Sequence, residues 1–135
     1  MKKLVFDADN AIVGRMGTVV AKELLRGNEV IIINAEKAII TGNKDNIIFR
    51  IKKWRKKGGS SQNGPKVSKM PDRLLKRMIR GMLPWDRPKG REAWRRLKCY
   101  VGNGDASESD LKAAKKFEHS PPFKFITIKQ ISELI

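Results

Sequence analysis

Val30-Ile31-Ile32-Ile33 is the stretch of this sequence that decides the fold. Its four β-branched apolar residues do not alternate with polar ones, which is typical of a strand covered on both faces of a parallel sheet. A shorter apolar run lies at residues 4–6. Between the two runs, residues 15–26 carry apolar side chains at helical spacing, and Gly27 follows as a helix stop. The pattern predicts a strand, a helix and a second strand.

Outward from this unit, strand and helix patterns keep alternating. We expect strands at residues 38–41, 98–101 and 123–127, and helices at 44–57, 71–83, 89–97 and 107–117. A last helix follows Thr127, which forms a capping box with Gln130. A chain of 135 residues suits one domain. The alternation therefore predicts a single three-layer α/β domain over residues 1–135, with a mainly parallel central sheet and helices on both faces.

Three of these helices combine an apolar stripe with a basic face. The stripes, which we expect to pack inward, are Ile47, Ile48, Ile51 and Trp54 in the first helix, Leu74, Leu75, Met78 and Met82 in the second, and Ala93, Trp94 and Leu97 in the third. Residues 58–69 lie between the first two helices and are rich in Gly, Ser, Asn and Pro, with no apolar periodicity. This composition predicts a long basic loop that RNA orders on binding.

The basic residues are concentrated in one part of the chain. The net charge is +16, and residues 42–98 alone hold nineteen basic and four acidic side chains, whereas the flanks, including a mixed-charge segment at 102–135, are nearly balanced. So many like charges in one folded stretch repel one another unless a polyanion neutralises them. Nucleic acid fits best, because each neutralised phosphate also releases condensed counterions. A surface that only confers solubility usually mixes both signs.

Three tryptophans lie among these cations. Helical phase favours core packing for Trp54 and Trp94. Trp85 follows Pro84 in a loop between basic helices, so stacking on an unpaired RNA base and packing against the fold are equal alternatives for it.

The strongest enzymatic alternative is a magnesium-dependent, haloacid dehalogenase-like phosphatase. Asp7-Ala8-Asp9 after an apolar run resembles that family's nucleophile motif. Residues 39–42 resemble its phosphate-binding strand end, and Asp105 with Asp110 resembles its acidic metal site. Asn10-Ala11 departs from the motif, however, and the chain is short for that fold. Turn formation after a strand therefore explains Asp7 and Asp9 better.

Other sites have weaker support. The single Cys99 and the single His119 make no disulfide and no Cys/His zinc cluster, and Cys99 is expected to be a small buried residue. Gly102-Asn103-Gly104 lacks the third glycine of a dinucleotide fingerprint and predicts a turn. No apolar run approaches the roughly 20 residues needed to cross a bilayer, and no secretory leader is evident. We expect no metal, cofactor, small-molecule substrate or membrane partner, and a cytosolic location.

Several motifs, taken in order, resemble one known family. Asp7-Ala8 leads to Val13-Gly14-Arg15-Met16 and then Ala21-Lys22. Ile33-Asn34-Ala35-Glu36-Lys37 is followed by Ile40-Thr41-Gly42-Asn43-Lys44, and Arg80-Gly81-Met82-Leu83-Pro84 comes after a basic helix. From about Val5 to Val101 the chain is similar to the universal large-subunit ribosomal protein thirteen family. The short connection between residues 26 and 30 and the absence of a long C-terminal helical extension match its archaeal-type members, whereas the residues after Val101 do not match the bacterial tail.

The resemblance implies a three-layer α/β fold, early entry into the large ribosomal subunit, and a structural role in the cytoplasmic ribosome without catalysis. The implied partners are large-subunit ribosomal RNA and neighbouring large-subunit proteins. The family's RNA contacts carry over to Lys44 and the helix after it, the loop at residues 63–66 and residues 80–84. RNA shape, not base sequence, is the expected target. The residues that we expect to contact RNA are Arg15, Lys44, Arg50, Lys52, Lys53, Arg55, Lys56, Lys57, Lys66, Lys69, Arg73, Lys76, Arg77, Arg80, Gly81, Arg87, Lys89, Arg91, Arg95 and Arg96.

Overall fold

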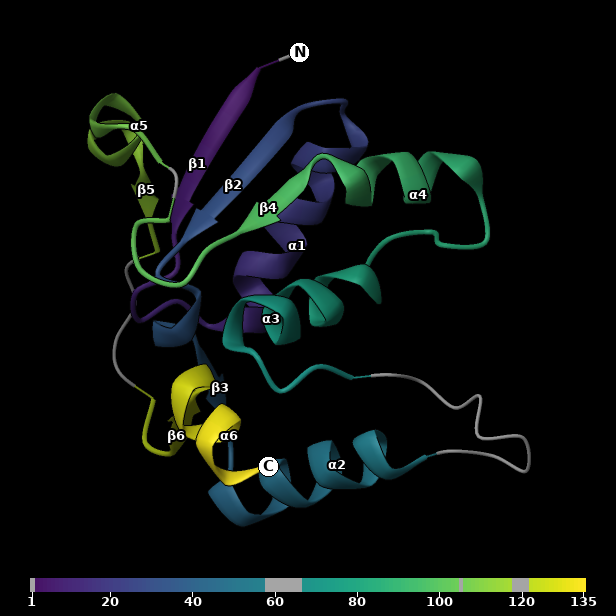
Figure 1. Ribbon diagram of the computed structural model, residues 1–135, viewed down its shortest axis with the longest axis vertical. Coiled ribbons are helices and arrows are strands. Elements are labelled where there is room, and N and C mark those ends of the chain that lie inside the picture. Colours follow the sequence, from purple (N-terminus) through teal and green to yellow (C-terminus); the bar gives the residue numbers. More distant parts are fainter. Residues whose placement is uncertain (1, 58–66, 105, 118–121) are drawn as a thin grey trace.

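A four-stranded parallel sheet forms the centre of the computed structural model, which describes residues 2–57, 67–104, 106–117 and 122–135 (Figure 1). The order across the sheet is β4 (Leu97–Cys99), β2 (Glu29–Ile33), β1 (Lys3–Asp7) and β5 (Lys115–Lys116). β2 is paired along both edges, with Ile31 opposite Val5 of β1 and Val30 opposite Leu97 of β4. This central position accounts for the unbroken apolar run in its sequence.

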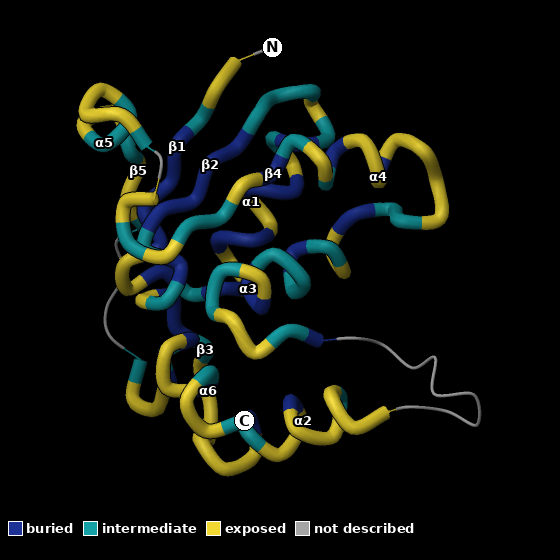
Figure 2. The backbone as a smooth tube through the Cα atoms, viewed as in Figure 1, coloured by how far each residue is buried: buried dark blue, intermediate teal, exposed yellow. Residues whose placement is uncertain are grey.

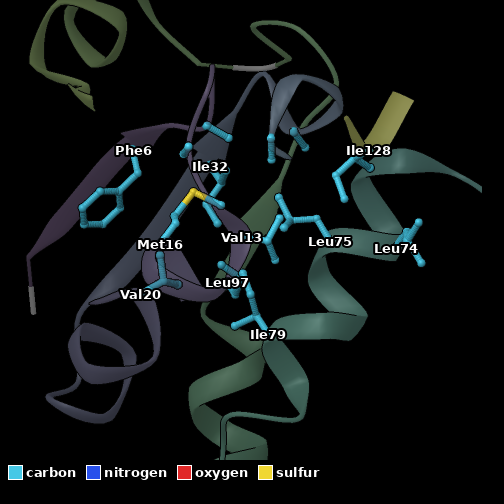
Figure 3. Close-up of a cluster of buried hydrophobic side chains, with 14 of the residues drawn as sticks. Phe6, Val13, Met16, Val20, Ile32, Leu74, Leu75, Ile79, Leu97 and Ile128 are labelled. Atoms are coloured by element: carbon cyan, nitrogen blue, oxygen red, sulfur yellow. The ribbon is translucent and has the colours of Figure 1, made fainter. Parts of the chain in front are cut away.

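Side chains of β1 and β2 alternate between the two faces of the sheet, and both faces are covered. Phe6 and Ile32 belong to the main core, which also contains buried side chains of α1 (Val13–Leu25), α3 (Pro71–Arg80) and α4 (Pro88–Arg95). Figure 3 shows this cluster, with Met16 of α1 and Ile79 of α3 among its members. Ile31 and Ile33 point to the other face and form a smaller cluster against Leu111 of α5 (Glu108–Ala113). The predicted three-layer α/β arrangement is confirmed.

A smaller antiparallel pair of strands joins the segment after β2 to the C-terminal part of the chain. β3 (Ile39–Thr41) pairs with β6 (Phe125–Thr127), and η1 (Ala35–Lys37), a single 3₁₀ turn, connects β2 to β3 (Figure 1). α6 (Ile128–Leu134) begins with the expected capping box, in which the Gln130 N–H donates to Thr127 Oγ1 and the Thr127 N–H donates to Gln130 Oε1, both over 3.2 Å. α2 (Lys44–Lys56) follows β3 after a short turn.

The segment after β4 departs most from the sequence prediction. The helix predicted at residues 107–117 spans only Glu108–Ala113. Lys115 and Lys116 instead pair with Phe6 and Asp7 as β5. The open edge of β1 carries backbone groups that need hydrogen-bond partners, and the periodicity of a distant segment cannot reveal that need. β6 likewise begins at Phe125 and not at residue 123, because its partner β3 is only three residues long.

Two apolar side chains lie further outside than their spacing predicts. Met82 is 39% exposed, because α3 ends at Arg80 and helical phase no longer sets the direction of later side chains. Ile79 is fully buried in the core instead. Val19, within the apolar pattern of α1, is 40% exposed. Helical spacing therefore predicts which face of a helix packs inward, but not how far that face extends along the helix or around it.

Candidate nucleic-acid interface

α2 exposes most of its surface, as Figure 2 shows. The helix begins where Asn43 Oδ1 accepts a hydrogen bond from the Asp45 N–H over 3.0 Å. Ile47 and Ile51 are its buried residues, and Trp54 is half-buried and packs against the same core. This narrow stripe leaves the predicted cations of the helix in solvent, namely Lys44, Arg50, Lys52, Lys53, Arg55, Lys56 and Lys57.

α3 holds two of its arginines, Arg77 and Arg80, against aromatic rings. Arg73 is exposed, whereas Lys76, Arg77 and Arg80 are half-buried. The guanidinium carbon of Arg77 lies 5.4 Å from the centre of the Trp54 ring, which brings α2 and α3 together. Burial and the neighbouring Arg80 guanidinium lower the pKa of Arg77 from its usual value. Burial is the larger of these two causes, and repulsion between the two guanidinium groups adds to it.

The turn between α3 and α4 is built on a pair of tryptophans. The rings of Trp85 and Trp94 meet edge to face, with their centres 5.3 Å apart. The Arg80 guanidinium carbon lies 3.9 Å from the Trp85 ring centre, and Lys76 Nζ lies 4.2 Å from that of Trp94. Trp54 and Trp94 both pack against the main core, as predicted. Trp85 is half-buried between Arg80 and Trp94, so the structure favours its packing alternative.

α4 and its flanks present a third group of exposed cations. These are Arg87, Lys89, Arg91 and Arg95. Arg91 Nε also donates to the Trp85 carbonyl oxygen over 3.0 Å, which orients its guanidinium. Arg96 differs from its neighbours, because it is half-buried and its Nη2 donates to the Leu24 carbonyl oxygen of α1. The structure thus gives Arg96 a structural role, although its spacing placed it on the basic face.

The remaining predicted contacts are spread around these helices. Arg15, near the start of α1, is exposed, as are Lys69 before α3 and Gly81 at its C-terminal end. Lys66 lies outside the described residues, as does most of the predicted basic loop at 58–69. The exposed Arg15, Lys69 and Gly81 are thus accessible to a partner.

The predicted cations lack carboxylate partners within the part of the chain that the structure describes. The three ion pairs among the described residues join Lys3 to Asp110 over 3.0 Å, Arg26 to Glu23 over 2.8 Å and Lys98 to Glu29 over 3.5 Å. None of these cations belongs to the predicted RNA-contact set. The acidic residues within and between the basic helices, among them Asp72 in α3 and Asp86 after it, are therefore not arranged to neutralise them. Helices α2, α3 and α4 together form a positively charged surface, called here the cationic surface.

Sequence reasoning missed one hollow beside this surface. It has a volume of about 330 Å³ and is lined by Gly42, Asn43, Lys44, Phe123, Lys124 and Phe125. The two segments are about 80 positions apart in the chain and meet because β3 pairs with β6. No local pattern in either segment signals this pairing.

The residues of the phosphatase alternative do not assemble into a site. Asp7 is 7% exposed, and its Oδ1 accepts hydrogen bonds from the Asp9 N–H over 2.9 Å and from Asn34 Nδ2 over 3.0 Å. These bonds are those of a turn after a strand, as predicted. Asp110 contacts Lys3, at the opposite end of β1 from Asp7. Asp105 lies outside the described residues, and the described ones contain no group of three His, Cys, Asp or Glu side chains that could hold a metal ion.

Cys99 and the neighbouring turn have structural roles. Cys99 is half-buried and not fully buried as expected, yet burial of its thiol raises the pKa to about 12, so the thiol is protonated at neutral pH. Gly102 and Gly104 have φ angles of +66° and +53°, as expected for the predicted turn. His119 lies outside the described residues. In the described parts of the chain, we find no helix with the length and apolar character needed to span a membrane.

Comparison with known proteins identifies the family. The family model described as ribosomal protein L13 matches residues 1–106. The large ribosomal subunit protein uL13 of Methanocaldococcus jannaschii is 45% identical over 132 residues, covering 96% of this chain and 94% of the relative. The uL13 protein of Archaeoglobus fulgidus is 36% identical over 135 residues, with 97% and 86% covered, and that of Methanosarcina barkeri is 50% identical over 99 residues, with 73% and 70% covered. The chain therefore belongs to the ribosomal protein L13 family, as an archaeal-type member.

Proposed function

We propose that this chain is a structural constituent of the large ribosomal subunit and binds large-subunit ribosomal RNA through the cationic surface. One observation carries the proposal: in the described chain, the lysines and arginines of α2, α3 and α4 have no carboxylate partners. Such a surface is stabilised by a polyanion, and phosphates supply the charge at a spacing that many side chains can reach together. The names of the archaeal relatives agree with this role.

The helices of the cationic surface suit different kinds of contact with RNA. α2 offers flexible lysines on a mostly exposed helix, which suits contact with the phosphates of an RNA backbone. Arg77 and Arg80 on α3 are held against Trp54 and Trp85, so their planar guanidinium groups lose little conformational freedom on binding. Contacts of this kind position the protein on RNA but do not read bases. Recognition of RNA shape follows.

The same charge distribution supports a role in early assembly. In the free protein the cations of this surface lie near one another without carboxylate partners among the described residues, and their mutual repulsion costs free energy. RNA binding removes this repulsion, so the protein is more stable on RNA than alone. A protein stabilised in this way is suited to joining the RNA before later components cover it. The cytoplasmic ribosome would be its location, with neighbouring large-subunit proteins as further partners.

Co-sedimentation tests the proposal directly. The purified chain is added to large subunits, or to protein-free large-subunit RNA, and centrifuged at moderate salt. It should sediment with both, and the bound fraction should fall as salt rises, because counterion release drives the binding. Absence from washed subunits, together with no affinity for the RNA at near-physiological salt, would contradict the proposal.

The enzymatic alternative is not carried forward. A ribosomal protein of this family is a structural component, and Asp7 already has the hydrogen bonds of a turn residue. The Asp7→Asn variant should therefore bind RNA like the unchanged chain. No magnesium-dependent phosphate release is expected from either protein.

A further inference from the structure

The hollow at the start of α2 combines an aromatic surface with positive charge. It brings Gly42, Asn43 and Lys44 together with Phe123, Lys124 and Phe125. We propose that it binds one unpaired RNA base, stacked on the ring of Phe123, with the adjoining phosphates against Lys44 and Lys124. This inference rests on the proposed RNA-binding function. It adds a second kind of contact to it, a single-stranded nucleotide beside the backbone contacts of α2.

Phe123 is too exposed to contribute to the core. Its side chain is 96% exposed, more than any other large apolar side chain in the described chain. Phe125 lines the same hollow and is 44% exposed. Large exposed apolar groups that cluster in one place indicate a binding surface more often than chance exposure. The ring of Phe123 is thus available to a partner.

The backbone that follows Phe123 is held in place. The Gly42 N–H donates to the Lys124 carbonyl oxygen over 3.0 Å, and Phe125 is paired with Thr41 in the β3–β6 ladder. The hollow is therefore formed by two hydrogen-bonded segments, so little backbone ordering is needed on binding. Figure 1 shows β6 beside β3, which leads into α2.

The chemistry of the lining selects a nucleotide over other partners. Lys44 and Lys124 are both exposed, and no acidic side chain is among the described residues that line the hollow. An unpaired nucleotide offers a flat ring for stacking and an adjacent negative charge, which matches this combination. The volume of about 330 Å³ is at the low end of the range for small-ligand sites, which suits a single base. α2 continues from the hollow with its exposed lysines and arginines, so one RNA strand can contact both.

A fluorescent single strand tests this inference on the full-length chain. The probe is a short oligouridylate with one internal 2-aminopurine, whose fluorescence falls when its ring is stacked and whose uracil neighbours stack weakly, and the comparison is a duplex of the same sequence. The unchanged protein should quench the single strand and leave the fluorescence of the duplex, which stacking within the helix already lowers, unchanged. Phe123→Ala should abolish quenching and weaken single-strand binding about tenfold, as expected for loss of one base–aromatic stack. Phe123→Tyr should retain both.

Two further variants separate stacking from apolar contact. Phe123→Leu keeps an apolar side chain but not an aromatic one, so it should behave like Phe123→Ala. Val101→Ala removes another exposed apolar side chain, which does not line the hollow, and should change nothing. Each variant should keep the melting temperature of the unchanged protein, because the altered side chains lie at the surface.

The possible results distinguish this inference from the proposed function. If Phe123→Ala quenches the probe like the unchanged protein, or if leucine restores binding as well as tyrosine, the stacking site is overturned. In the leucine case an apolar partner, such as a neighbouring protein, is the better occupant. Loss of quenching in Phe123→Ala with ribosomal RNA binding largely intact supports the site. Failure of the unchanged protein to bind ribosomal RNA counts against the cationic surface instead.

Discussion

Arg96 Nη2 donates to the carbonyl oxygen of Leu24 over 2.6 Å, which ties the end of α4 to the last turn of α1. A cation at a helix C-terminus also interacts favourably with the partial negative charge of the unpaired carbonyl groups there. Arg95, the preceding residue, is exposed. Two consecutive arginines therefore have different roles, one in the fold and one on the cationic surface.

Arg96→Ala should lower the free energy of unfolding by about 1.5–3 kcal/mol, the usual contribution of a hydrogen bond to a charged group. Arg95→Ala, the matched control, should change it by less than about 0.5 kcal/mol but should weaken RNA binding. Urea denaturation measures the first effect, through the midpoint at unchanged slope. A larger loss of stability in Arg95→Ala than in Arg96→Ala would be inconsistent with the observed contact.

Replacing Arg50, Lys53 and Lys57 by Ala together should weaken binding to large-subunit RNA and reduce its dependence on salt. The slope of log affinity against log salt should fall by about 0.7 to 0.9 for each lost phosphate contact. A variant with Lys22, Lys37 and Lys112 replaced by Ala loses the same charge from exposed positions outside the cationic surface. Filter binding at several salt concentrations compares the two, and equal slopes would rule out α2 as a binding helix.

Gly90→Ala should destabilise the protein by about 1–3 kcal/mol, as overpacking usually does. A Cβ atom at Gly90 would overlap the backbone carbonyl of Pro84, and backbone cannot move aside as a flexible side chain can. Gly14→Ala is the matched control, because no atom lies within 4 Å of the added Cβ. Alanine there should be neutral or stabilising by up to about 1 kcal/mol. Thermal denaturation of both variants tests the contrast.

Cys99 should react slowly with thiol reagents in the folded protein. Its pKa is raised from 9.0 to about 12 by burial, so at pH 8 the thiolate is about a thousandfold rarer than in an unfolded chain. Because the folded pKa is the higher one, this group favours the folded state below pH 9, and that contribution is lost as pH rises towards 12. Ellman's reagent, applied with and without denaturant, measures the difference. Equal rates would show that the thiol is not buried.

Much of the fold follows from local patterns. The apolar run at Val30–Ile33 identified the central strand β2, and helical spacing located α1, α2 and α3 to within a few residues. The basic faces could also be predicted, because helical phase and charge are properties of neighbouring positions. Five or so local motifs were enough to indicate the family, which the matches to archaeal relatives confirm.

What the sequence by itself determined is thus the central strand, the amphipathic helices and the concentration of positive charge. Only the tertiary structure decided that Lys115 and Lys116 complete the edge of β1, that Arg96 binds the end of α1, and that Phe123 and Lys44 line the same hollow. The physical reason is that periodicity reports on contacts within one element. Pairings between distant segments depend instead on which backbone groups and surfaces remain unsatisfied once the core has formed.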